Sequence, residues 1–241
     1  MAEITGDRNA AYDLISLVFD QPRHWPTTAA NEALSAEAVD RAIAAAQKLS
    51  TGMPIQYAAN KAVFRHHTLF VDERVLIPRP ETEVLVDIVL ESTRGVNGGT
   101  VVDIGTGSGA IALALATEGT FERVIATDIS ADALGVARMN ATRVIPSEVE
   151  ESASLQFRLG SILTAVPERG LRAVVSNPPY IAFEEADTLP ALVRDWEPSV
   201  ALFAGNSGNA VAAAIIREAA DALMAMSLFF TRNVCAPHAS T

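Results

Sequence analysis

Strand-like and helix-like apolar runs alternate between residues 101 and 176, and this is the clearest pattern in the chain. The strand-like runs are short and rich in β-branched residues, and apolar positions at helical spacing fill the segments between the first three. In chain order these segments are 101–104, 110–117, 123–127, 131–140, 155–159 and 171–176. This order predicts an α/β fold, with a parallel sheet that carries helices on both faces.

The first fifty residues show apolar positions at helical spacing only. Two helices are predicted within 10–49, with a loop at 21–26 between them and a break at 51–54. The positions that define the two helices are Leu14, Leu17 and Val18, and then Val39, Ile43 and Ala46. We therefore expect a small helical domain over residues 1–53.

Shorter β-type runs follow from Ile55 to Ile77, and they predict a β-hairpin that links two domains over residues 54–78. Pro80, with acidic residues in the next turn, predicts the start of a helix. The runs are 62–64, 68–71 and 75–77, and the expected apolar stripe of the helix is Val84, Leu85, Ile88 and Val89. A larger domain is expected over 79–241.

The last third of the chain is less regular. Residues 208–225 are alanine-rich and predict a helix, and Leu228-Phe229-Phe230 could begin a strand. Residues 145–154 form an acidic stretch without apolar period, which predicts a loop, and 233–241 resembles a tail.

Composition and charge restrict the class of protein and the partners that can be expected. The 241 residues are 49% hydrophobic and 20% charged, which is typical of a globular protein. A net charge of −11 argues against direct nucleic-acid binding, since such binding relies on Lys and Arg. Cys235 is the single cysteine, so a reducing cytoplasm is compatible. The N-terminus lacks signal-peptide features, and no apolar stretch is long enough to span a membrane.

A glycine-rich segment, Asp103-Ile104-Gly105-Thr106-Gly107-Ser108-Gly109, joins the first strand of the sheet to its helix. Glycines allow a ligand to approach the backbone closely, and ligands of such sheets bind at the carboxyl ends of the strands. A tight strand-to-helix turn without a ligand would have the same glycines, so the segment alone is a weak signal.

Asp128 strengthens the ligand hypothesis because it ends the next strand, where an acidic residue can accept both ribose hydroxyls of an adenosine group. Alternatively, Asp128 or Ser130 caps the following helix, and both roles can hold if the two residues share them. The glycine segment contains no Lys or Arg, so a polyphosphate is not indicated. S-adenosylmethionine, an adenosine that carries an amino acid, fits better.

The tetrapeptide Asn177-Pro178-Pro179-Tyr180 follows the strand predicted at 171–176. Its prolines end the strand because proline has no backbone N–H. The turn presents an amide, prolyl carbonyls and an aromatic ring, which together can bind a planar group that carries an NH2. An ordinary Asn-Pro turn is the alternative.

Together these segments resemble the release-factor glutamine methyltransferase family (HemK-type). The resemblance rests on the helical N-terminal domain, on Val75-Leu76-Ile77-Pro78-Arg79-Pro80-Glu81-Thr82-Glu83, on the glycine segment and on the tetrapeptide. Glu197-Pro198 and the run from Ala201 to Gly205 add to it. The segment from Ile77 to Glu83 is the most specific, whereas the tetrapeptide is shared with enzymes that methylate adenine or guanine.

The resemblance implies a Rossmann-like, S-adenosylmethionine-dependent methyltransferase that modifies the glutamine amide in the Gly-Gly-Gln loop of peptide-chain release factors. It implies residues 1–53 as the substrate-recognition domain, a cytoplasmic location and no metal. Catalysis and substrate binding are assigned to Asn177, Pro178, Pro179 and Tyr180. Cofactor binding is assigned to Asp103, Gly105, Thr106, Gly107, Ser108, Gly109, Asp128, Ile129, Ser161, Ile162 and Asn177.

Two departures from the family pattern are visible. Ser161 stands where the family usually has an Asp that approaches the adenine amino group. Met224-Ala225-Met226-Ser227 replaces a Pro-Gly-Gly turn, so the methyltransferase domain is expected to be incomplete at its C-terminal end. Two alternatives therefore stay open beside the leading interpretation: an amino-methyltransferase acting on a nucleic-acid base, and a catalytically impaired homologue.

Overall fold

The computed structural model of the chain describes residues 2–28, 33–95, 97–145, 154–205, 208–223 and 228–230. Residues 228–230 are described by their backbone alone. Most of the predicted acidic loop, the segment 224–227 and the predicted tail at 233–241 lie outside the described residues.

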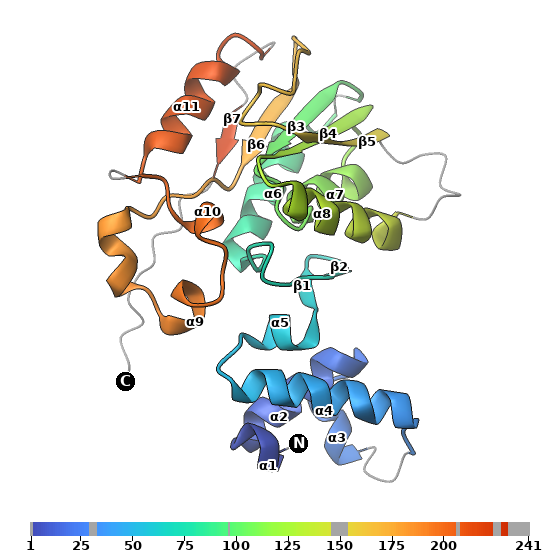
Figure 1. Cartoon of the computed structure of the whole chain (residues 1–241). Helices are drawn as coiled ribbons and strands as arrows, with labels where there is room; N and C mark the ends of the chain where they lie inside the picture. The colour runs from blue at the N-terminus through green and yellow to red at the C-terminus, as the bar shows by residue number, and fades with distance from the viewer. Residues whose placement is uncertain are drawn as a thin grey trace.

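A parallel sheet forms the centre of the larger, C-terminal part of the described chain (Figure 1). Its strand order is β5-β4-β3-β6-β7, and every neighbouring pair is parallel. The strands are β3 (Thr100–Ile104), β4 (Arg123–Asp128), β5 (Ser154–Leu159), β6 (Ala173–Ser176) and β7 (Leu228–Phe230). The predicted parallel sheet is confirmed, including a strand at 228–230, although β6 begins two residues later than expected.

Helices cover both faces of this sheet, as predicted (Figure 1). Val101 faces a core built with α6, α7 and α8, whereas the next residue, Val102, faces a core built with α11. This alternation follows from the two-residue period of a strand. The covering helices are α6 (Pro80–Ser92), α7 (Ala110–Glu118), α8 (Ala131–Val144) and α11 (Ala210–Ala219).

Helix α6 begins at Pro80 as predicted, but its buried face differs from the expected stripe. Val84 and Ile88 are 57% and 48% exposed. The buried side chains are Thr82, Leu85, Val86 and Val89. Helix α11 also differs, since it ends at Ala219 rather than at 225.

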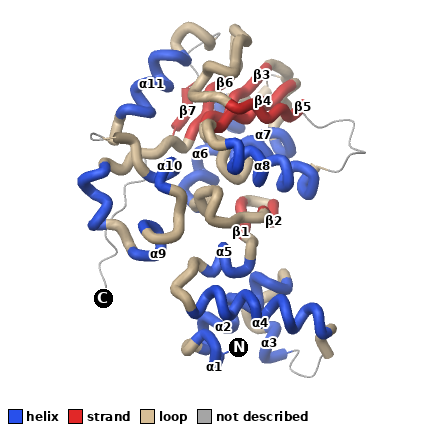
Figure 2. The backbone as a smooth tube through the Cα atoms, viewed as in Figure 1, coloured by secondary structure: helices blue, strands red, loops and turns tan. Residues whose placement is uncertain are grey.

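The N-terminal helices form a separate cluster below the hairpin in the view of Figure 2. They are α1 (Ala2–Thr5), α2 (Arg8–Phe19), α3 (Trp25–Thr28), α4 (Ala36–Ser50) and α5 (Ile55–Ala59). The predicted face of α4 is confirmed at Ala46 and wrong at Val39 and Ile43, which are partly exposed; the other buried residues are Ala38, Ala42 and Ala45. Small side chains allow the neighbouring helices to approach closely. The division into domains at 53 and 78 stays a prediction.

The linking segment contains the predicted hairpin, with β1 (Ala62–Phe64) antiparallel to β2 (His67–Leu69). The β-type interpretation of the rest of this segment is wrong. Residues 55–59 form α5, whose Tyr57 is fully buried. Residues 75–77 form a loop, and the Val75 carbonyl accepts a hydrogen bond from the Tyr57 hydroxyl at 2.6 Å instead of pairing in a sheet.

Between β6 and α11 the chain forms three short helical turns that the sequence pattern did not predict: η1 (Phe183–Thr188), α9 (Ala191–Arg194) and α10 (Ser199–Leu202). Among the described helices, none combines the length and apolar character that a membrane crossing requires.

Candidate functional site

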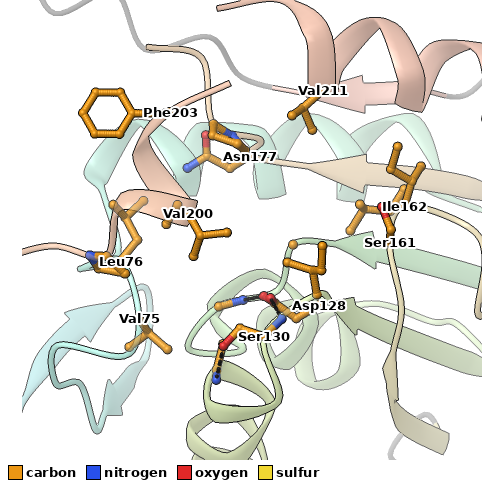
Figure 3. Close-up of a pocket in the computed structure, with 18 of the residues that line it drawn as sticks. Val75, Leu76, Asp128, Ser130, Ser161, Ile162, Asn177, Val200, Phe203 and Val211 are labelled. Carbon is orange, nitrogen blue, oxygen red and sulfur yellow. Dashed lines mark hydrogen bonds between the residues drawn. The ribbon is translucent and has the colours of Figure 1, made fainter. Parts of the chain in front are cut away.

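A cavity of about 410 Å³ opens at the carboxyl ends of four neighbouring strands (Figure 3). The residues that follow β3, β4, β5 and β6 all reach it, because parallel strands deliver their ends to one edge of the sheet. Of the residues predicted for cofactor or substrate, Gly105, Gly107, Asp128, Ile129, Ser161, Ile162, Asn177 and Pro179 line the cavity.

The glycine segment contributes two residues to the cavity wall. Gly105 and Gly107 have φ of 70° and 55°, a region that glycine enters without steric cost. A Cβ built on either residue meets no atom within 4 Å, so both border open space. Gly109 has another role: a Cβ there would lie 3.3 Å from Ala137 Cβ, and the glycine lets α7 and α8 pack closely.

Three predicted cofactor residues, Asp103, Thr106 and Ser108, lie behind the loop and do not line the cavity. Asp103 Oδ2 accepts hydrogen bonds from Thr106 Oγ1 at 2.6 Å and from the Ala112 amide at 3.2 Å. Burial raises the pKa of Asp103 to about 7, although these two hydrogen bonds oppose the shift. Asp103 therefore holds the loop, through Thr106, to the start of α7 on the side away from the cavity.

Asp128 holds the loop from the cavity side. Its Oδ2 accepts from the Gly107 amide and its Oδ1 from the Ser130 amide, both at 2.9 Å (Figure 3). Burial raises the pKa of Asp128, and backbone N–H groups act in the opposite direction. The helix cap is Ser130, whose Oγ accepts from the Ala133 amide at 3.2 Å. Ser130 thus takes the capping role, and ribose binding by Asp128 stays a prediction.

The turn after β5 brings Ser161 and Ile162 to the cavity. Ile162 has φ of 52°, which is rare for a β-branched residue and costs conformational energy. Its carbonyl accepts from Thr127 Oγ1 at 3.3 Å, and the next amide donates to Glu218 Oε2 at 3.1 Å. These two bonds hold the strained turn, which places Ile162 on the cavity wall.

Only two of the four tetrapeptide residues line the cavity. Asn177 and Pro179 line the cavity, whereas Pro178 is buried and Tyr180 is half-buried outside the lining set. The side-chain amide of Asn177 donates from Nδ2 to Thr82 Oγ1 at 3.1 Å. The Ser176 hydroxyl donates to the Ile104 carbonyl at 2.8 Å, which ties the end of β6 to the end of β3.

A second wall of the cavity was not predicted as part of the site. It consists of the loop Arg74, Val75 and Leu76, the segment Pro198, Val200, Ala201 and Phe203, and the first turns of α11 at Ala210, Val211 and Ala214. The sequence signals for it are the family resemblance at Val75-Leu76, at Glu197-Pro198 and at 201–205. Periodicity had instead assigned Val75 and Leu76 to a strand.

The ion pair of Arg79 and Glu197 joins the residue before α6 to the residue before the wall segment that starts at Pro198. Arg79 Nη2 lies 2.6 Å from Glu197 Oε1, and the Glu197 side chain is only 2% exposed. Burial raises the pKa of Glu197, while the Arg79 charge and hydrogen bond oppose this. Phe203 further stacks on Phe183 with ring centroids 5.2 Å apart. Within the described residues, no cluster of side chains is suited to a metal ion.

Comparison with known proteins agrees with this architecture. A family model described as "Methyltransferase small domain" matches residues 62–195. A release factor glutamine methyltransferase of Koribacter versatilis is 36% identical over 208 residues, which cover 86% of this chain and 72% of that protein.

Two further relatives share this description. The protein of Enterococcus faecalis is 41% identical over 74% of this chain and 61% of its own length. The protein of Lactococcus lactis is 42% identical over 73% of this chain and 62% of its own length. The chain thus spans about three fifths of the length of these two relatives.

Proposed function

Because this chain belongs to the release factor glutamine methyltransferase family, we propose that it transfers a methyl group from S-adenosylmethionine to a glutamine side-chain amide, in the Gly-Gly-Gln loop of a peptide-chain release factor. One observation carries the proposal. The glycine loop and Asp128, which suit an adenosine ligand, border the same cavity as Asn177 and Pro179, which suit a planar amide.

The residues present fit S-adenosylmethionine. Gly105 and Gly107 leave open space where side chains would block a ligand. Asp128 uses its oxygens for backbone amides, yet a carboxylate has about four acceptor positions, so capacity for ribose hydroxyls is left. Ile129 and Ile162 supply apolar walls for the purine. When bound, S-adenosylmethionine supplies an electrophilic methyl group.

The tetrapeptide orients the acceptor nitrogen. Asn177 Oδ1 and the Pro178 carbonyl each accept one N–H bond from the substrate amide, which directs its nitrogen toward the methyl carbon. Such orientation matters because an amide nitrogen is a poor nucleophile, and near-attack geometry lowers the barrier. The bound cofactor would supply the methyl group, the glutamine nitrogen would gain the N–C bond as the S–C bond broke, and the proton on the methylated nitrogen would leave to solvent.

The helical segment 1–53 is proposed to contact the release factor, and such a substrate places the reaction in the cytoplasm. A net charge of −11 disfavours a nucleic-acid substrate, because binding to the phosphate backbone relies on Lys and Arg.

Transfer of a labelled methyl group tests the proposal. The purified chain is incubated with labelled S-adenosylmethionine and either a release factor, the same factor with its Gly-Gly-Gln glutamine changed to alanine, duplex DNA or ribosomal RNA. Label is expected on the unaltered release factor only. Label on nucleic acid alone would identify a base methyltransferase, and label on no acceptor would identify an impaired homologue; each result contradicts the proposal.

A further inference from the structure

We propose that Thr82 is a positioning residue for methyl transfer, because its hydroxyl binds the Asn177 side-chain amide and holds it in the orientation that leaves Oδ1 for the substrate. The inference rests on the proposed function of the cavity. It gives a physical reason for a threonine in the segment Pro80-Glu81-Thr82-Glu83, which reaches the site from a different part of the chain.

The contact is partly buried, with Thr82 on the buried side, and its two partners stand at the ends of regular elements. Thr82 is only 4% exposed and occupies the third position of α6, where its amide donates to the Arg79 carbonyl at 3.0 Å. Its Oγ1 accepts from Asn177 Nδ2 at 3.1 Å, across 95 positions of sequence. Asn177 itself directly follows β6, whose last residue is tied to β3. Neither partner lies on a long loop.

The orientation of an asparagine amide needs such a partner. The terminal torsion of asparagine is broad and roughly two-fold, so packing alone separates its two orientations poorly. A substrate NH2 is a donor and requires an acceptor. While Nδ2 is bound to Thr82, Oδ1 points away from Thr82 and can accept from the substrate. If the amide were reversed, Nδ2 would face the substrate NH2, and two hydrogen-bond donors would meet.

The polar residues on either side of Thr82, Arg79 and Glu83, hold the first turn of α6 in place. Arg79 pairs with Glu197, and Glu83 Oε1 accepts from the Arg65 amide at 3.0 Å in the hairpin. The first turn of α6 is thus attached to the cavity wall on one side and to the hairpin on the other. Thr82, between them, is held at a fixed distance from Asn177.

Thr82→Val tests the inference, because valine keeps the shape of threonine and removes only the hydroxyl. We expect kcat for transfer to a release factor to fall about tenfold, the loss that one buried hydrogen bond converts to. The dissociation constant of S-adenosylhomocysteine should change less than twofold. The matched control Thr82→Ser keeps the hydroxyl and should recover most of kcat. KM for the release factor should rise in Thr82→Val and less in Thr82→Ser, and both changes should be smaller than the changes in kcat.

A double-mutant cycle with Asn177→Ala separates this role from a structural one. If Thr82 acts through Asn177, Thr82→Val should cause no further loss in the Asn177→Ala protein, whereas an equal tenfold loss there would overturn the inference. Unchanged kcat in Thr82→Val would also overturn it.

A readout without turnover keeps the inference distinct from the proposed function. The side-chain amide proton resonances of Asn177, followed by NMR in the protein without substrate, should shift in Thr82→Val and return in Thr82→Ser. Unchanged resonances would refute the contact even if the wild-type chain methylates release factors. A wild-type chain that transfers no methyl group would instead refute the proposed function, whatever the resonances show.

Discussion

Arg79 and Glu197 form an ion pair across 118 positions of sequence, with 2.6 Å between Nη2 and Oε1. Arg79 directly precedes α6, and Glu197 directly precedes the cavity-lining Pro198. Glu197 is almost fully buried, and its second oxygen has no hydrogen-bond partner among the described residues. The pair therefore fastens one wall of the cavity to the start of the helix that carries Thr82.

Arg79→Met is expected to lower the free energy of unfolding by about 2–3 kcal/mol, since it leaves a buried carboxylate unpaired. A fully buried pair would lose about 3–5 kcal/mol, but Arg79 is 27% exposed. Urea denaturation measures the change. Arg94→Met, which removes a surface pair with Glu91, is the matched control and should change stability by less than about 1 kcal/mol. Equal effects of the two variants would contradict a structural role for the Arg79 pair.

Asp128→Asn should weaken binding of S-adenosylhomocysteine about 10- to 100-fold, measured by isothermal titration calorimetry. The change removes a charged acceptor and turns one NH2 toward a backbone N–H, and charged hydrogen bonds contribute about 1.5–3 kcal/mol. Asp132→Asn, in the exposed first turn of the same helix, serves as control and should leave binding unchanged. An unaltered dissociation constant for Asp128→Asn would remove Asp128 from the cofactor site.

Asp103 should make stability decrease as pH rises. Its pKa is raised by burial from 3.8 to about 7 in the folded chain, so folding favours the protonated form. The stabilising contribution is complete below pH 3.8 and is lost as pH rises to 7. We expect the free energy of unfolding, relative to Asp103→Asn, to fall by up to about 1.4 kcal/mol per pH unit in this window. A difference between the two proteins that does not vary with pH would contradict burial as the cause.

Asn177→Ala should lower the single-turnover rate of methyl transfer by about 10²- to 10³-fold, to a residual rate that can still be measured, and leave the dissociation constant of S-adenosylhomocysteine within a few-fold of wild type. The variant removes the acceptor for the substrate amide but none of the glycine loop or Asp128. Single-turnover transfer and calorimetry separate the two effects. Turnover at the wild-type rate would show that Asn177 does not orient the acceptor.

Ser161→Asp should strengthen binding of S-adenosylhomocysteine several-fold, because a carboxylate at this cavity position is a stronger acceptor for the adenine amino group than a hydroxyl. Thr164→Asp adds the same charge in the same exposed turn away from the cavity lining, and it should have little effect. Similar changes from both variants would point to general electrostatics rather than to a contact with adenine.

The sequence by itself determined the parts of this protein that depend on local pattern. Buried parallel strands are continuous apolar runs, so the sheet could be predicted, and with it the placement of Gly105, Asp128 and Asn177 after strand ends. The start of α6 could be predicted from Pro80 and the acidic residues that follow it. Because parallel strands end at one edge, the convergence of these residues on one cavity followed from the topology.

Tertiary structure alone decided which residues complete the site. Val75 and Leu76 have the composition of a strand, yet burial of Tyr57 beneath them and the bond from its hydroxyl keep this segment a loop on the cavity wall. Asp103, placed in the cofactor site by its motif, is turned behind the loop by its bonds to Thr106 and Ala112.

The partners of Asn177 and Glu197 lie 95 and 118 positions away, and a contact of that range leaves no period in the sequence. Thr82 and Arg79 could be recognised as unusual only through a family resemblance. Their contacts depend on the packing of the start of α6 against the end of β6 and the segment before α10. Only this packing sets which hydroxyl reaches the Asn177 amide and which guanidinium reaches the Glu197 carboxylate.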